Sequence, residues 1–88
     1  MVTIRFKSIP ENYRKEYLGL KNNTLRKFEE EGDAREEIVD SFIAKKVNNI
    51  DIEISNTETS EYFVRKITDI TRYKDWYIFI LRRLLRQN

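Results

Sequence analysis

The chain contains no cysteine and no histidine. A disulfide framework is therefore excluded, and so are zinc and iron–sulfur sites built on thiolate or imidazole ligands. A serine or cysteine nucleophile activated by histidine is excluded as well. An enzyme with this sequence would have to use lysine, carboxylate, threonine or tyrosine side chains. Only an oxygen-ligated metal such as magnesium or calcium stays compatible, and no spaced series of aspartates suggests one. We expect no metal and no cofactor.

Long apolar runs are also missing. The longest, "WYIFIL" at 76–81, is far too short to span a membrane. The first residues, "MVTIRFK", alternate between apolar and polar side chains and lack the hydrophobic region of a signal peptide. We therefore expect a cytoplasmic protein with no membrane partner. The asparagine- and isoleucine-rich composition fits an AT-rich bacterial or phage genome.

The 88 residues are enough for one small domain, which we place at 1–88. Residues 1–28 hold seven basic and two acidic residues, a balance of +5, and residues 62–88 hold the same numbers. Residues 29–61 hold three basic and eleven acidic residues, a balance of −8. If the two basic ends fold onto one side, they form a positive face that attracts phosphate groups. The alternative is that the charges only keep a small domain soluble.

Apolar periodicity divides the chain into seven elements. The alternating segment 2–6 predicts a half-buried strand. Ser8 with Glu11, and Asp33 with Glu36, have the spacing of a helix-capping box. Each pair therefore predicts the start of a helix. The expected order is strand 2–6, a helix from Pro10 to near Lys21, strand 24–28, a helix from Asp33 to about Val47, and strands 50–54, 62–68 and 76–81.

The second half of the chain has the pattern of strands. Segment 50–54 alternates cleanly, a polar turn leads into 62–68, and 69–75 is expected to be a second connection. Segment 76–81 is apolar on both faces, which suggests a central strand or an association surface. The tail, 82–88, extends that strand, forms a helical turn or frays. We expect an α+β domain of order β-α-β-α-β-β-β, mostly antiparallel in its second half and curled into a partial barrel.

The segment "GLKNNTLRKF" at 19–28 concentrates polar groups where the first helix should pass into the second strand. A short connection would bring the ammonium group of Lys21 near the Thr24 hydroxyl and the Arg26 guanidinium. These groups suit a nucleotide, a nucleobase or a backbone phosphate, and Asn23 can add amide contacts. The structural alternative is a lysine at a helix C-terminus, asparagine at its exit, and threonine and arginine on an exposed strand.

Residues Gly19 to Arg26 resemble the Gly-x-Lys-x-x-(Glu/Thr)-x-Arg signature of the ASCH domains, which have a PUA-like fold. The signature lies where that family places it, after an initial strand and helix. The resemblance implies an RNA- or nucleotide-binding cleft lined by the signature residues. One branch of the family hydrolyses acetylated cytidine with the lysine and threonine of the motif and a distant glutamate, which would make Lys21 and Thr24 catalytic. The distant acid has no clear counterpart, because the candidates lie in expected turns: Glu58, Glu61, Asp69 and Asp75.

The leading hypothesis is a small RNA- or nucleotide-binding module that does not turn its ligand over. Its ligand-binding residues would be Lys21, Asn23, Thr24 and Arg26, with Arg65 in support. A basic and aromatic segment near Tyr73 could contact single-stranded RNA or form part of the core. Two alternatives stay open. One is a protein-interaction or inhibitor module of bacterial or phage origin, and the other is an amidohydrolase acting on a modified nucleoside. The sequence leaves the oligomeric state undetermined.

Overall fold

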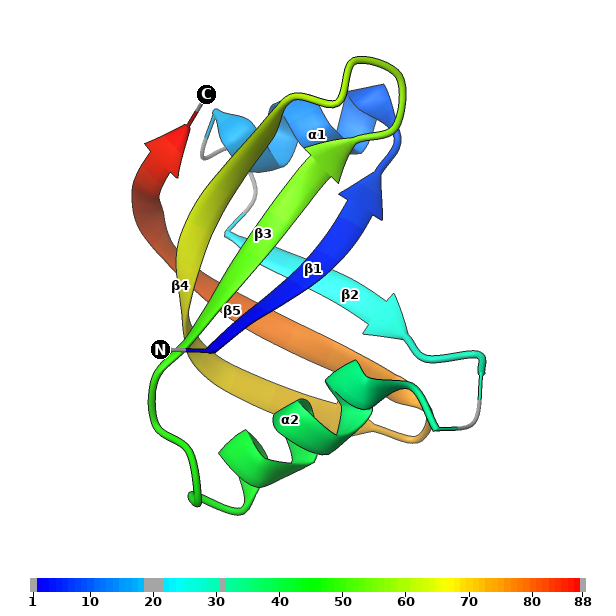
Figure 1. Ribbon diagram of the computed structural model, residues 1–88, viewed down its shortest axis with the longest axis vertical. Helices are drawn as coiled ribbons and strands as arrows, with labels where there is room; N and C mark the ends of the chain where they lie inside the picture. Colours follow the sequence, from blue (N-terminus) through cyan, green and yellow to red (C-terminus); the bar gives the residue numbers. More distant parts are fainter. Residues whose placement is uncertain (1, 19–21, 31, 88) are drawn as a thin grey trace.

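The fold is given by a computed structural model that describes residues 2–18, 22–30 and 32–87, with side chains described up to Arg82. Lys21, with Gly19 and Leu20, lies outside the described residues. The elements follow the order β-α-β-α-β-β-β, which confirms the expected α+β partial barrel with two helices (Figure 1). Their bounds are β1 Val2–Ser8, α1 Pro10–Tyr17, β2 Asn23–Lys27, α2 Ala34–Ile43, β3 Ile50–Asn56, β4 Tyr62–Tyr73 and β5 Trp76–Gln87.

All five strands belong to one sheet with the order β1-β3-β4-β5-β2. The pair β1–β3 is parallel, and the other three pairs are antiparallel. The sheet curls, so that the two edge strands, β1 and β2, come to face each other (Figure 1). We call the side of the molecule between these two edges the seam. At the seam the half-barrel is open, because β1 and β2 are not paired through their backbones.

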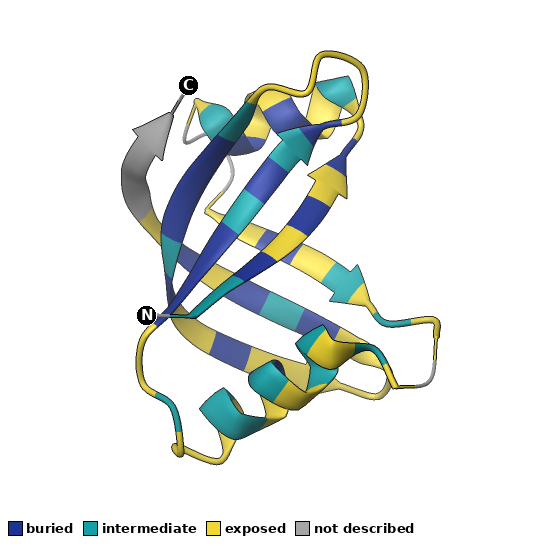
Figure 2. Cartoon of the chain, in the orientation of Figure 1, coloured by how far each residue is buried: buried dark blue, intermediate teal, exposed yellow. Residues whose placement is uncertain are grey.

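The core fills the inside of the curl, and the two helices cover its ends. Buried and more exposed residues alternate along β1, β2 and β5 up to Arg82, as expected when one face of a sheet packs inward, whereas β3 has no exposed residue (Figure 2). Phe6 of β1 contacts Phe79 of β5 and Phe28, which follows β2, so aromatic packing crosses the inside of the seam. Side chains with no measurable exposure come from α2 and the three central strands: Val39, Ile50, Ile52, Ile54, Phe63 and Phe79.

The first helix does not begin as the capping pattern predicted. Ser8 is the last residue of β1 and points into the core, while Ile9 precedes the helix and makes no side-chain cap bond. The inward alternation of β1 continues through Ser8, so its hydroxyl is directed away from the helix end and bonds Glu16 instead. The helix then ends at Tyr17, before the expected end near Lys21.

The second helix begins as predicted and ends early. Asp33 is the N-cap residue, and its carboxylate accepts a hydrogen bond from the backbone N–H of Arg35 at 2.9 Å. The helix ends at Ile43, because Lys45 adopts a left-handed conformation with φ of 62°. The N–H groups of Lys45 and Lys46 then bond back to carbonyls in the last turn, which closes the helix with a Schellman motif.

The expected connection at 69–75 was wrong. Strand β4 continues to Tyr73, and only Lys74 and Asp75 form the turn to β5. Lys74 adopts φ of 55°, which permits a two-residue hairpin without glycine. Register shifts between Val64 and Asp69 bend the long β4–β5 pair, so one continuous hairpin curls around the core. The tail extends β5 as a strand through Gln87.

Candidate functional site

Strand β2 divides the polar signature residues between its two faces. Side chains alternate along a strand, so Thr24 and Arg26 point inward, opposite Phe79 and Tyr77 of β5. Asn23, which pairs with Ile80, lies on the outer face and is exposed. The structure therefore brings Thr24 and Arg26 together and separates Asn23 from them.

Arg26 reaches across the seam from β2 to β1. Its Nε donates to Thr24 Oγ1 at 3.0 Å, which fixes the guanidinium relative to its own strand. Its Nη1 donates to the carbonyl of Lys7 at 2.7 Å, and its Nη2 donates to Ser8 Oγ at 2.6 Å. The same guanidinium lies 5.0 Å from the centre of the Phe6 ring. One side chain thus joins the two open edges of the sheet.

A buried carboxylate lies behind this guanidinium. Glu16 of α1 is only 1% exposed, and Ser8 Oγ donates to its Oε1 at 2.9 Å. Its Oε2 lies 3.8 Å from Arg26 Nη2, an ion pair. Burial lowers the pKa of Arg26, and the negative charge of Glu16 opposes that shift. An arginine stays protonated in either case, so the pair holds one positive and one negative charge at the floor of the seam.

Arg65 is buried in β4 and is directed toward the end of α1. Its Nη1 donates to the carbonyl of Glu16 at 3.3 Å, and its Nη2 donates to Asn22 Oδ1 at 3.0 Å. Its Nε donates to the carbonyl of Arg82 on β5. Burial lowers the pKa of this arginine as well. These contacts show a structural function, joining β4, β5 and the segment that enters β2.

Two adjoining hollows open along the seam. The first, which we call the polar hollow, has a volume of about 240 Å³ and includes Ser8, Glu16, Thr24 and Arg26 in its lining. The second, the basic hollow, has a volume of about 480 Å³. Lys7 and Arg26 line both hollows, which therefore adjoin, and we call the two together the depression. The residues of the basic hollow come from three strands, β1, β2 and β3, and from α2: Arg5, Phe6, Lys7, Arg26, Lys27, Arg35, Glu53 and Ser55.

A second arginine also joins elements across the seam. Arg35 of α2 donates from Nη1 to the carbonyl of Arg5 at 2.8 Å, and its guanidinium lies 4.7 Å from the centre of the Phe6 ring. Asp33 holds it with an Nη2–Oδ2 contact of 2.6 Å, and hydrogen bonds from Arg35 lower the pKa of Asp33. Arg26 and Arg35 therefore fix neighbouring positive charges over one aromatic ring.

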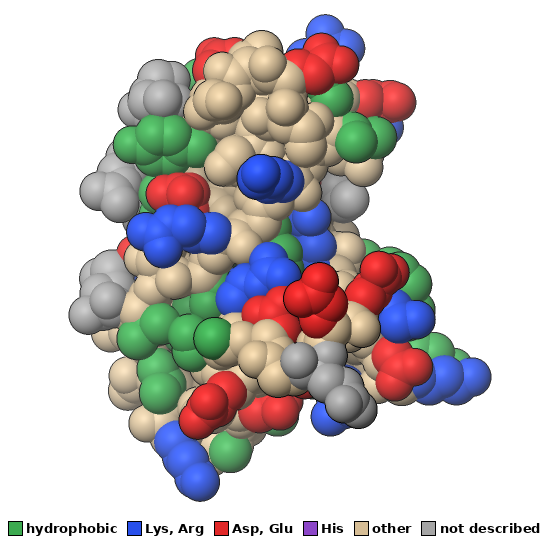
Figure 3. Space-filling model, turned by 45° about the vertical axis from the view of Figure 1, so that its right-hand side comes forward, with side chains coloured by type: hydrophobic (Ala, Val, Ile, Leu, Met, Phe, Trp, Pro, Cys, Tyr) green, Lys and Arg blue, Asp and Glu red, His purple; other side chains and the backbone are tan. Residues whose placement is uncertain are grey.

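Charge in the basic hollow is only partly neutralised. Three of its five basic residues are paired with carboxylates: Arg5 with Glu53, Arg26 with Glu16, and Arg35 with Asp33. Lys7 and Lys27 are exposed, and within the described part of the chain neither forms an ion pair. Five positive and three negative charges leave an excess of two. Basic side chains are visible across the middle of the molecule from this side (Figure 3).

Sequence reasoning missed several of these residues. No pattern in the sequence singled out Glu16, and Ser8 was predicted to cap a helix. One feature of the sequence could have located Ser8. It follows Ile4 and Phe6 at every second position, which places its side chain on the buried face of the strand. No local pattern could bring Lys7 and Arg35 to the same hollow, because their proximity depends on how the sheet curls.

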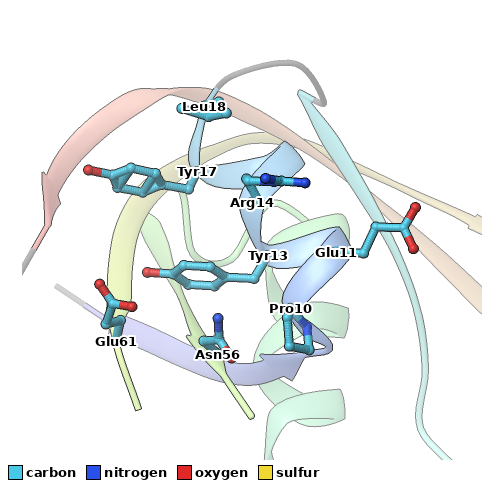
Figure 4. Close-up of a pocket in the computed structure, with 8 residues that line it drawn as sticks. All are labelled: Pro10, Glu11, Tyr13, Arg14, Tyr17, Leu18, Asn56 and Glu61. Carbon is cyan, nitrogen blue, oxygen red and sulfur yellow. The ribbon is translucent and has the colours of Figure 1, made fainter. Parts of the chain in front are cut away.

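A larger hollow, of about 710 Å³, lies elsewhere, between α1 and the β3–β4 turn (Figure 4). The parallel rings of Tyr13 and Tyr17, 6.0 Å apart, form one wall, and Asn56 and Glu61 lie on the other side. Burial raises the pKa of Tyr13, and the charge of Glu61 adds to the shift. None of the signature residues that the structure describes, 22–26, lines this groove, and its surface is mainly apolar.

No group of three or more acidic side chains that could hold a metal ion occurs in the described residues. Among the same residues, no helix combines the length and the apolar character needed to cross a membrane. No protein-family model matches the chain, and no curated protein matches it. Fold and site together define a small α+β half-barrel domain with a basic depression at its open seam. The ASCH resemblance stays a prediction from the sequence.

Proposed function

We propose that this protein is a small module that binds RNA or a nucleotide in the depression along its seam, without turning the ligand over. The observation that carries the proposal is the excess of two positive charges in the basic hollow, contributed by Lys7 and Lys27. A concave surface lined by one sign of charge attracts the opposite sign, and phosphate groups are the anions that such surfaces bind in nucleic acids.

The residues of the seam would have two different functions. Arg26 and Arg35 donate to backbone carbonyls of β1, so they act as fixed charges that shape the depression. Lys7 and Lys27 have mobile, solvated ammonium groups that can move to a phosphate. Thr24 is 2% exposed and already accepts a bond from Arg26, so we assign it to the floor beneath a ligand. A contact from Lys21 remains part of the proposal on the strength of the signature.

The test is a binding titration with single-stranded RNA at several salt concentrations. Replacing both Lys7 and Lys27 with alanine should weaken binding and lower the slope of log affinity against log salt by about 0.7 for each phosphate that the protein no longer neutralises. The control is the double variant Lys45→Ala with Lys46→Ala, which removes the same charge from the end of α2. Equal slopes for the two double variants, or no binding by the wild type at low salt, would exclude the proposal.

Lys21→Ala tests the signature separately. The proposal predicts that this single variant binds single-stranded RNA more weakly than the wild type, with little change in the free energy of unfolding. Arg26 is unsuitable for this purpose, because its replacement would also release the contact between β1 and β2. Unchanged affinity in Lys21→Ala would remove the signature lysine from the site and leave the proposal resting on the basic hollow.

A second candidate function, amide hydrolysis of an acylated nucleoside, is favoured by the position of Glu16. The carboxylate of Glu16 and the hydroxyl of Thr24 line the same polar hollow, and Arg26 contacts both. The acids considered from sequence lie in other parts of the chain, whereas Glu16 is next to the signature threonine. Incubation with acetylcytidine should release cytidine and acetate from the wild type and not from Glu16→Gln. Product formation no faster than without protein eliminates this function.

A further inference from the structure

The outer face of the β4–β5–β2 sheet carries a row of large side chains next to the hairpin turn. In an antiparallel ladder, residues directly opposite each other point to the same side. Tyr73 pairs with Trp76, and Trp76 pairs with Lys27, so the three side chains form a row across three strands. Tyr73 is 63% exposed and Trp76 is 41% exposed. This row lies on the face of β2 opposite to Thr24 and Arg26.

Each ring of this row is accompanied by a lysine. The Nζ atom of Lys27 lies 5.8 Å from the centre of the Trp76 ring, and the Nζ atom of Lys74 lies 5.5 Å from the centre of the Tyr73 ring. Neither ammonium group forms an ion pair with any residue that the structure describes. We call these four residues the aromatic platform. It combines two exposed aromatic rings with two ammonium groups that form no ion pair among the described residues.

We propose that the aromatic platform is a subsite for single-stranded nucleic acid, in which neighbouring bases stack on Trp76 and Tyr73. Base–aromatic stacking next to basic side chains is the usual means of binding a single strand without reading its sequence. Lys27 and Lys74 would contact the phosphates that flank the stacked bases. The inference rests on the proposed function. It narrows the ligand from RNA or a nucleotide to a single-stranded oligonucleotide, because a free mononucleotide could not occupy the basic hollow and the platform together.

Lys27 connects the platform to the basic hollow. It borders that hollow on the seam side and contacts Trp76 on the outer side. A strand whose phosphate lies in the basic hollow can therefore continue across the end of β2 onto the outer face of the sheet. The ligand we infer is an oligonucleotide of several residues that passes over this edge.

Charge argues against a second copy of this chain as the occupant of the platform. A two-fold contact places the same patch of both copies together, and would bring Lys27 and Lys74 of one copy near those of the other. Like charges at such an interface oppose association. The apolar neighbours Leu25 and Ile80 lie one and two rows away from the platform on the same face, and they supply a matched control.

Trp76 is the only tryptophan, so its fluorescence reports directly on the platform. Titration of the wild type with octauridylate at low salt should quench this fluorescence, whereas uridine monophosphate at the same nucleotide concentration should not. Tyr73→Ala and Trp76→Leu should each weaken octauridylate binding about tenfold. Trp76→Phe keeps an aromatic ring and should retain most of the affinity. Leu25→Ala removes apolar surface from the same face and should bind as tightly as the wild type.

The outcomes separate the platform from the seam. The platform is overturned if the wild type binds octauridylate without fluorescence quenching and Tyr73→Ala binds it as tightly as the wild type. The proposed function is left intact in that case. Weakened binding in the platform variants but not in Lys7→Ala supports the platform and overturns the basic hollow. No binding by the wild type overturns both. Analytical sedimentation tests the alternative occupant. If the wild type is a dimer and Leu25→Ala is a monomer, the outer face of the sheet binds a second copy of this chain instead. Fluorescence quenching in the wild type tests stacking on Trp76 even if the Trp76→Leu variant does not fold.

Discussion

Arg26 has four bonding partners from three elements, and they limit what it can offer a ligand. Its donors are directed to Thr24, to the carbonyl of Lys7 and to the hydroxyl of Ser8, and its charge is paired with Glu16. A guanidinium held in this way supplies a fixed electrostatic field and little new hydrogen bonding. The residues able to rearrange around a phosphate are the lysines beside it.

Tyr77 gives the first prediction, at the scale of one residue. Burial raises its pKa to about 12, and the charge of Asp40, which its hydroxyl contacts at 3.2 Å, adds to the shift. The unfolded chain loses the phenolic proton near pH 10, while the folded chain keeps it to near pH 12. The free energy of unfolding should therefore be unaffected below about pH 10 and fall by about 2 kcal/mol as the pH rises to 12.

The measurement is urea unfolding at pH 9 and pH 11, followed by circular dichroism. Tyr77→Phe has no proton to lose, so its stability should decline less over this interval than that of the wild type. The pKa of Tyr13 is also raised, and its contribution cancels in the comparison because both proteins retain it. Parallel declines in the two proteins would show that Tyr77 does not titrate as its surroundings require.

At the scale of elements, β2 is the element on which both proposed surfaces depend. It is five residues long and lies at the edge of the sheet, paired only with β5. Its inward residues, Thr24 and Arg26, form the floor of the seam, and its outward residue Lys27 borders the platform. A shift of its register by one residue would exchange these faces and remove both surfaces at once.

The end of α2 gives the second prediction. Lys45 occupies the left-handed position of the Schellman motif, where glycine is normally preferred, and a side chain there is strained by about 1 kcal/mol. Lys45→Gly should raise the free energy of unfolding by about 0.5–1 kcal/mol, after allowance for the greater freedom of glycine in the unfolded chain. Lys46 has an ordinary φ, so Lys46→Gly should lower the free energy of unfolding. Chemical denaturation of the two variants measures both changes. Equal effects at both positions would contradict the motif.

The whole molecule is a curled sheet whose open side is held by side chains. Backbone ladders join β1 to β3 and β5 to β2, whereas hydrogen bonds from guanidinium groups join β1 to β2 and to α2 among the described residues. Arginine donors satisfy the outward carbonyls of Arg5 and Lys7, which also protects this edge from pairing with another strand. The seam is therefore the side of the half-barrel that has no backbone ladder, and the basic hollow lies there.

The third prediction concerns this closure. Arg26→Met keeps a long side chain but leaves the Glu16 carboxylate buried without its ion-pair partner, so the free energy of unfolding should fall by about 3 kcal/mol. Adding Glu16→Gln should recover at least about 1 kcal/mol, because the unpaired charge is removed. Hydrogen exchange should accelerate most in β1 and β2 and least in β3 and β4. Additive effects of the two substitutions, or uniform acceleration, would contradict closure by this pair.

The sequence by itself determined the order and type of the seven elements, the half-barrel class and the cap at Asp33. These features depend on periodicity and on residues close in the chain, which a sequence displays directly. It also placed Thr24 and Arg26 on the same face of a strand. The errors in the sequence prediction arose where two local structures compete for the same residues. Ser8 ends β1 instead of capping α1, a positive φ at Lys45 ends α2, and a positive φ at Lys74 closes the β4–β5 hairpin.

Only the tertiary structure decided which charges meet. Lys7, Arg26 and Arg35 come from three separate elements, and they share one depression because the sheet curls until its edges face each other. The same curl buries Glu16 beneath the seam. Curvature and register arise from packing across the whole core. No short stretch of sequence therefore contains the information that assembles this surface.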